Sequence, residues 1–163
     1  MADYSSPDSD DFEALSRDSV LVRSLQADDL NAIIRIDKKI TGEDRSDYYR
    51  SKLDEVMDVS GIRVSLVAEV DGAAAGFIMA RVDFGDYGKA EPAAVIDTIG
   101  VNPGFAHQGI GQALLSQLLA NLSILHVESV RTLLRWDDFA LLAFLGNCGF
   151  APSQRLVFTR RID

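Results

Sequence analysis

The sequence predicts an α+β domain in which antiparallel hairpins come first and two strand–helix units follow. Runs of strand-like and helix-like pattern succeed one another in the order β-α-α-β-β-β-α-β-α-β. At 163 residues, with an apolar fraction of 47%, the chain is long enough to bury one core. Residues 1–18 carry six carboxylates against Arg17 alone. We therefore expect residues 1–19 to form a disordered acidic tail and residues 20–163 to form the domain.

The first three elements are a strand and two helices. Residues 20–25 alternate weakly and are expected to form the strand. Residues 27–40 follow as a helix, with Asp28 and Asp29 in the first turn, where negative charge is favourable. Ser46 is expected to cap a second helix. The apolar residues that share a face are Leu30, Ile33 and Ile34 in the first helix, and Tyr49, Leu53, Val56 and Met57 in the second.

A hairpin and a central strand come next. Residues 62–70 and 73–84 flank Asp71-Gly72, which is a strong hairpin signal. A polar loop then leads to residues 93–101, whose apolar side chains favour a central strand that ends before Pro103.

The carboxyl-terminal third is expected to contain two helices and two strands. A helix begins in the glycine loop and buries Leu114, Leu118 and Leu122. Residues 129–136 are strand-like, residues 137–149 form a short helix, and residues 155–162 close the domain as a strand.

The composition argues against a nucleic-acid partner, a membrane span and a metal site. The net charge of −9 argues against a nucleic-acid partner, which attracts clustered Lys and Arg. No apolar run approaches the ~20 residues that a membrane span needs. The lone Cys148 and only two histidines make a metal site unexpected and favour a reducing cytoplasm.

The most informative stretch is "HQGIGQALL", residues 107–115. Glycines at a strand-to-helix junction let main-chain N–H groups converge on an anion at the positive end of a helix. The dinucleotide pattern is incomplete because Leu114 occupies the third glycine position, and a P-loop is excluded because no G-K-[S/T] is present. On the loop alone, a purely structural glycine turn stays open.

The residues around this loop carry a resemblance. "IGVNPGFAHQGIGQALLSQLL" resembles the pyrophosphate-binding segment of the GNAT superfamily of acyl-CoA-dependent N-acetyltransferases, through Val101, Pro103, Gly109, Ile110 and Gly111. The element order is also similar, over about residues 20–162. The resemblance implies a mixed, mostly antiparallel sheet of about six to seven strands flanked by about four helices.

The resemblance also implies a cofactor, acetyl-CoA. The main chain of residues 108–112 would hold the pyrophosphate, with His107 or Gln108 standing in for a family Gln or Arg that falls on Ala106. Ile99, Gly100 and Val101 would pair with the pantetheine arm through their main chain. The residues assigned to cofactor binding are Ile99, Gly100, Val101, His107, Gln108, Gly109, Ile110, Gly111, Gln112 and, at the position of a family asparagine, Asp138.

The catalytic candidates are Asp97, Ile99 and Tyr87. Asp97 interrupts an apolar strand, so it is a candidate general base, with a structural hydrogen bond as the alternative. The Ile99 N–H is the candidate oxyanion donor. The family's usual acidic tyrosine falls on Leu145, so either Tyr87 donates the proton or the thiolate, with a pKa near 8.5, leaves unaided. Asp137 and Asp138 are also typical of helix caps.

The acceptor is predicted to be a primary amine on a small molecule or peptide. Acidic and aromatic residues of "DKKITGEDRSDYYR" suit a cation, although a solvated helical rim has the same composition. Two other classes stay open, a non-catalytic acyl-CoA-binding module and an unrelated nucleotide-binding protein. The resemblance is also compatible with a homodimer.

Overall fold

The computed structural model describes residues 20–59, 64–85 and 87–163. The chain divides into two compact units, Met1–Leu133 and Leu134–Asp163. The acidic tail expected at residues 1–19 and the first two residues of the strand expected at 62–70 lie outside the described residues.

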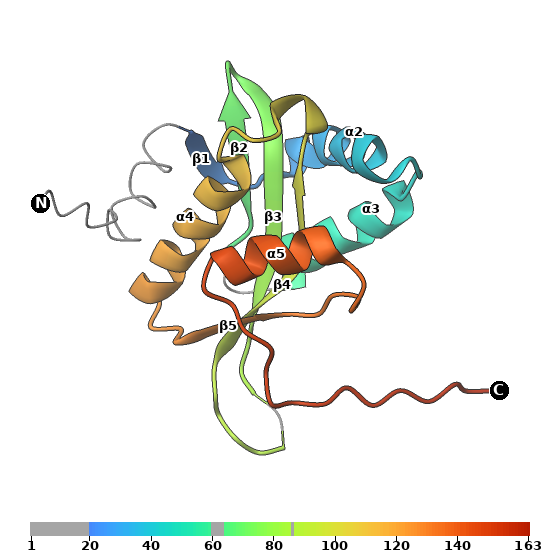
Figure 1. Ribbon diagram of the computed structural model, residues 1–163, viewed down its shortest axis with the longest axis vertical. Helices are drawn as coiled ribbons and strands as arrows, with labels where there is room; N and C mark the ends of the chain where they lie inside the picture. The colour runs from blue at the N-terminus through green and yellow to red at the C-terminus, as the bar shows by residue number, and fades with distance from the viewer. Residues whose placement is uncertain (1–19, 60–63, 86) are drawn as a thin grey trace, which may run out of the picture. The chain divides into compact units, whose positions relative to one another are not determined.

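The first unit contains one five-stranded sheet with the order β1-β2-β3-β4-β5 (Figure 1). Its strands are antiparallel to their neighbours except at the last pair, where β4 and β5 are parallel. The strands are β1 (Leu21–Ser24), β2 (Leu66–Val70), β3 (Ala73–Asp83), β4 (Ala93–Val101) and β5 (Ser129–Thr132). The mixed sheet confirms the α+β prediction, with five strands among the described residues in place of six to seven.

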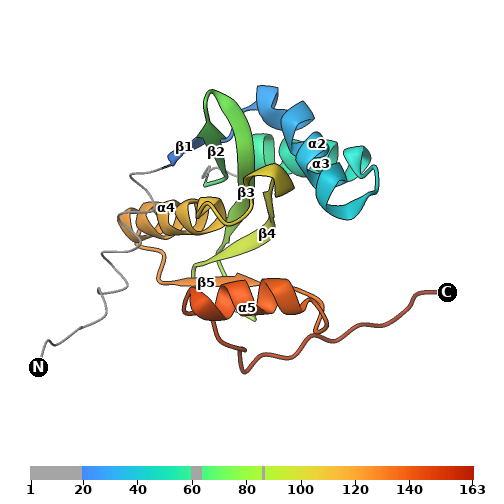
Figure 2. The same ribbon diagram turned by 45° about the horizontal axis from the view of Figure 1, so that its top comes forward.

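The helices of this unit lie on both faces of the sheet. They are α2 (Leu30–Thr41), α3 (Ser46–Asp54) and α4 (Ile110–Ile124), with short turns η1 (Ala27–Asp29), η2 (Glu55–Val59) and η3 (Pro103–Phe105). Ile110 and Leu114 of α4 lie against Gly76, whereas Tyr49 of α3 packs on Phe77. Because consecutive strand residues face opposite sides, α4 covers one face of the sheet and α2 and α3 cover the other (Figure 2).

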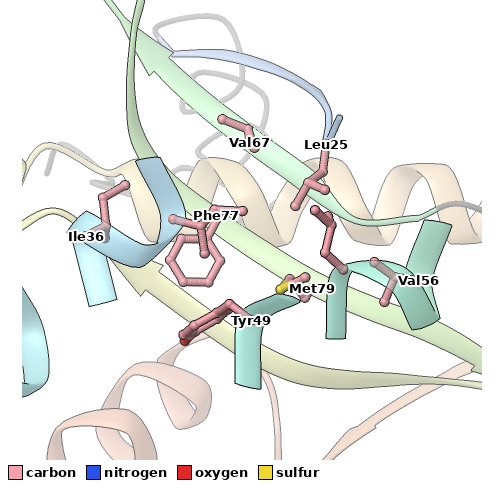
Figure 3. Packing of buried hydrophobic residues seen from close by; sticks show 9 residues of the cluster. Leu25, Ile36, Tyr49, Val56, Val67, Phe77 and Met79 are labelled. Atoms are coloured by element: carbon pink, nitrogen blue, oxygen red, sulfur yellow. The ribbon is translucent and has the colours of Figure 1, made fainter. Parts of the chain in front are cut away.

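The core beneath α2 and α3 is apolar and aromatic (Figure 3). The ring of Tyr49 meets that of Phe77 edge-on at a centroid distance of 5.8 Å, and both side chains are about 1% exposed. Its buried members are Leu25, Ile33, Ile36, Tyr49, Leu53, Val56, Val67, Phe77 and Met79. This packing fixes α3 against the middle of β3 and β4.

The predicted strands and helices of residues 20–149 are present, but several are shorter than predicted, and the strand expected at 129–136 ends at Thr132. β4 begins and ends where the sequence predicts, and the turn before β3 has positive φ at both Asp71 and Gly72, as a two-residue hairpin loop requires. Ser46, however, does not cap α3. It is the first helical residue, and Asp44 accepts hydrogen bonds from its N–H and Oγ at 3.0 and 2.6 Å.

The second unit contains α5 (Phe139–Asn147) and an extended carboxyl-terminal segment. The prediction of a strand at residues 155–162 is wrong in this structure, where those residues have no regular secondary structure and are exposed. The segment contains the apolar run Leu156–Phe158, but a strand exists only when a neighbour satisfies its main-chain groups, and no described strand pairs with this segment.

Candidate functional site

Strand β4 contains a bulge at Asp97. Thr98 lies opposite Met79, but Ile96 lies opposite Ala80, so Asp97 is the extra residue on β4. Strict alternation would send Asp97 and Thr98 to opposite faces. With the bulge, both side chains face α3. The Asp97 carboxylate lies 3.6 Å from Lys52 of α3, and the Thr98 hydroxyl lies 3.4 Å from the hydroxyl of Tyr49 of α3.

The parallel pairing with β5 ends at this bulge. The last partners are Ile96 and Thr132, and the Thr132 hydroxyl donates to the Ile96 carbonyl at 2.9 Å. Beyond this point, residues 98–101 pair with β3 on one side, and β5 does not continue along the other. The two strands therefore separate at the middle of β4.

The main chain of Ile99 and Val101 points toward that separation. The N–H of Asn102 donates to Ala75 of β3 at 2.8 Å, and the Gly100 carbonyl lies beside Gly76 of β3. Because main-chain groups alternate along a strand, those of Ile99 and Val101 point away from β3. Gly100 has another role, since a β-carbon there would lie 2.7 Å from the Phe77 ring.

The amino-terminal end of α4 lies beside the same part of β4. A β-carbon built on Gly76 would meet Ile110 at 2.9 Å, the Gly100 oxygen at 3.1 Å and Leu114 at 3.2 Å. Gly109, the residue before the helix, has φ +75° and no atom within 4 Å of where its β-carbon would be. No side chain caps this helix, so its first N–H groups point outward, as anion binding requires.

Asp97 lies between two cations, and one of its carboxylate oxygens has no hydrogen bond from the described residues. Its side chain is 12% exposed, with Lys52 Nζ 3.6 Å from Oδ2 and Arg81 Nε 3.5 Å from Oδ1. Oδ2 is buried and has no hydrogen-bond partner in the described part of the chain. A buried carboxylate oxygen without a donor is costly, which favours a functional role over the structural alternative.

Of the acidic residues expected to attract the acceptor, Asp37 is buried, whereas Glu43, Asp44 and Asp47 are exposed. Asp37 is buried, accepts two hydrogen bonds from Arg45 and accepts a third from the Tyr49 hydroxyl at 2.8 Å. Arg45 holds the pKa of Asp37 below its usual range, while burial raises the pKa of Tyr49 to about 12. Asp44 holds the start of α3, and Asp47 pairs with Arg50. This set fixes the α2–α3 connection beside Thr98.

Tyr48 is one of the aromatic residues expected near the acceptor. Its ring contacts Tyr49 edge-on at 5.0 Å and its side chain is partly exposed. Burial raises the pKa of its hydroxyl, which also feels the charges of Lys52 and Asp97. The helical periodicity places Tyr49 on the apolar face with Leu53 and Val56, and the structure agrees, with Tyr49 buried and Tyr48 exposed.

Tyr87 lies away from the bulge. It is fully exposed in the loop before Ala93, whereas the glycine loop follows Val101 at the other end of β4 (Figure 1). Its role as proton donor stays a prediction. His107, with φ +62°, and Gln108 are exposed in the loop before α4, as a cofactor contact would require.

Asp138 caps α5 by accepting from the Leu141 N–H at 3.2 Å, which confirms the capping interpretation. Its neighbour Asp137 does not cap, because it forms a two-point ion pair with Arg135. Asp138 belongs to the second unit, and its cofactor role stays a prediction.

The described residues contain no cluster of His, Cys, Asp or Glu suited to a metal ion. Among the same residues, every helix is too short or too polar to cross a membrane.

Residues 28–150 match the sequence model of the Acetyltransferase (GNAT) family, and the chain belongs to this family. The fold is similar to that of an aminoglycoside N-acetyltransferase, AAC(6′)-Iy, in complex with CoA. The two share 18% identity at a TM-score of 0.72, over 87% of this chain and 94% of the other.

Two further solved structures have the same fold. The ribosomal-protein-S18-alanine N-acetyltransferase from Escherichia coli is 22% identical with a TM-score of 0.68, over 83% of this chain and 79% of that chain. A transcriptional regulator from Bacillus halodurans C-125 is 15% identical with a TM-score of 0.72, over 87% and 99%.

Proposed function

We propose that this chain is an N-acetyltransferase that moves the acetyl group of acetyl-CoA directly to a primary amine. One arrangement supports the proposal most strongly. Among the described residues, a helix start without a side-chain cap, a strand edge without a neighbouring strand and a buried carboxylate oxygen without a hydrogen bond occur along one short segment, from Asp97 to Gln112. Membership of the acetyltransferase family and a CoA-bound structural relative agree with it.

The residues present fit acetyl-CoA. The open space at Gly109 leaves the N–H groups of residues 108–112 accessible to a pyrophosphate, and His107 and Gln108 are exposed beside them. Ile99 and Val101 offer outward main-chain groups to an extended amide chain, while Gly100 lets Phe77 pack beneath the strand. We assign cofactor binding to these residues.

The bound thioester supplies an activated acetyl group, and the protein must supply a proton acceptor and a hydrogen-bond donor. Asp97 is the proposed base, because Oδ2 can accept a hydrogen bond and then a proton from an amine that enters at the bulge. The Ile99 N–H is the proposed donor to the carbonyl oxygen that gains charge, two residues from Asp97. Asp37 and Asp44 accept hydrogen bonds from their own neighbours, and Asp97 is the residue that we propose contacts the amine.

A thiol-release assay tests this function. Acetyl-CoA would be offered with small primary amines, amino-acid amides, and peptides with a free amino terminus or lysine. We expect release with at least one class, reduced about 100-fold in kcat/KM or more by Asp97→Asn, as for loss of a general base. Asp54→Asn, an exposed carboxylate on α3, is the matched control and should be unaffected. Equal rates for wild type and Asp97→Asn would refute the assignment of the base.

A second candidate is a non-catalytic acyl-CoA-binding domain. Leu145 at the family's usual tyrosine position favours it, as does the similarity to a protein named as a transcriptional regulator. Acetyl-CoA binding measured by calorimetry, without thiol release from any amine between pH 6 and about pH 9, would select this candidate.

A further inference from the structure

Four charged side chains, each from a different element, form a ring next to the bulge. Lys52 of α3 donates a 2.8 Å hydrogen bond to Glu55 at the start of η2, and the same Nζ lies 3.6 Å from Asp97 Oδ2. Arg81 of β3 closes the ring, with Nε 3.5 Å from Asp97 Oδ1 and 4.0 Å from Glu55 Oε1. Two cations therefore alternate with two carboxylates.

The distances in this ring are unequal. Lys52 hydrogen-bonds to Glu55, which is 45% exposed, and not to Asp97, which is 12% exposed. A carboxylate buried without water is the stronger acceptor for an ammonium, so an unrestrained Lys52 would be drawn to Asp97. Glu55 holds the ammonium back, close enough to act on Asp97 by charge and too far to occupy Oδ2.

We propose that Lys52 and Glu55 are positioning residues for Asp97: Lys52 compensates the charge of the carboxylate from 3.6 Å, and Glu55 prevents Lys52 from closing on the carboxylate that receives the substrate's proton. This inference rests on the proposed function, since it assumes that Asp97 is the base. It assigns the pair no contact with the acetyl group or the amine. A direct Lys52–Asp97 hydrogen bond would block the proton acceptor, and loss of Lys52 would leave a buried charge with less compensation.

The other charged and titratable groups near the ring are Tyr48 of α3, Asp83 of β3 and Arg131 of β5. Arg131 donates to Asp83 at 2.6 Å, and Arg81 lies 3.9 Å from the same carboxylate. Burial raises the pKa of Tyr48, so its hydroxyl stays neutral at the pH values of the test. Among the described residues, Lys52 is thus the positive charge that lies against Oδ2, at 3.6 Å.

The test compares Lys52→Met, Lys52→Arg and Glu55→Gln with the controls Arg50→Met and Asp54→Asn, which alter exposed charges of the same helix. The first readout is the pH profile of kcat/KM. We expect Lys52→Met to move its acidic limb up by about 1 pH unit and Lys52→Arg to restore it. Glu55→Gln should lower kcat about tenfold, with a smaller change in KM, because Lys52 then closes on Asp97. A purely structural pair would change stability but leave the limb in place.

The second readout does not need turnover. The NMR chemical shift of the Asp97 carboxyl carbon is measured against pH in ¹³C-labelled protein, and the signal is identified by its absence from Asp97→Asn. Its midpoint should rise in Lys52→Met and fall in Glu55→Gln, with no change in the two controls. Unchanged midpoints would overturn this inference even in an active enzyme. Shifted midpoints in a protein that releases no thiol would support the action of Lys52 and Glu55 on Asp97 and refute the proposed function.

Discussion

Gly100→Ala tests how the strand that carries the candidate site is held. Its β-carbon would lie 2.7 and 2.9 Å from two atoms of the Phe77 ring and 3.3 Å from Ile40. Real β-carbons do not approach other atoms that closely, so the ring or the strand must move. Phe77 is about 1% exposed and packs edge-on against Tyr49, which leaves it little room.

The expected cost follows from overpacking one methyl group in a close-packed core, about 1–3 kcal/mol. Urea denaturation followed by far-UV circular dichroism would measure the free energy of unfolding. Gly104→Ala is the matched control, because its β-carbon would meet only Asn102 Oδ1 at an ordinary 3.4 Å, and it should cost less than about 0.5 kcal/mol.

A double-mutant cycle assigns the cost to the ring. Phe77→Leu removes the clashing atoms, so adding Gly100→Ala to that variant should cost about 1 kcal/mol less than adding it to wild type. The reasoning is refuted if Gly100→Ala is as stable as wild type, or if its cost is unchanged when Phe77 is absent.

Three further predictions concern groups around the site. Burial raises the pKa of Tyr49 to about 12, so the protein loses stability as the pH rises above about 10, where the unfolded chain releases this proton first. In urea titrations between pH 9 and pH 11, the free energy of unfolding of wild type should fall by about 1 kcal/mol more than that of Tyr49→Phe. Arg45 lowers the pKa of Asp37, so the stabilisation from this ion pair is present above about pH 4 and lost on acidification. In thermal melts, Asp37→Asn should be less stable than wild type at pH 7 and should lose less stability on acidification. Melting temperatures of the two proteins that fall in parallel with pH would contradict this. Asp138→Ala removes the cap of α5 and should cost about 1 kcal/mol, seen as faster amide hydrogen exchange in α5 with unchanged exchange in α4.

The sequence predicted the elements that local patterns decide. The apolar run of β4, the Asp-Gly hairpin turn and the glycine start of α4 depend on neighbours within a few residues, and all three are present. Asp97 could be singled out because an acid in an apolar strand is visible in the sequence.

The rest depended on tertiary pairing. The bulge at Asp97 exists only in the register with Met79 and Ala80, so the sequence could not show that Asp97 turns toward Lys52. Asp37 and Asp44 looked like acceptor ligands because their partners, Arg45 and Ser46, have no distinctive spacing. The segment at 155–162 has the pattern of a strand, but no pattern within it can reveal whether a neighbour pairs with it.

The central claim is that the loop before α4 binds acetyl-CoA through its main chain. Isothermal titration of acetyl-CoA into wild type, Gly109→Val and Gly42→Val tests it most directly. Gly42 and Gly109 have φ of +76° and +75° and equally open surroundings, so valine at either imposes the same strain, about 1–3 kcal/mol. The account predicts binding to wild type and to Gly42→Val, with Gly109→Val about tenfold weaker or more. Equal affinity for all three folded proteins, or no binding to wild type, would contradict it.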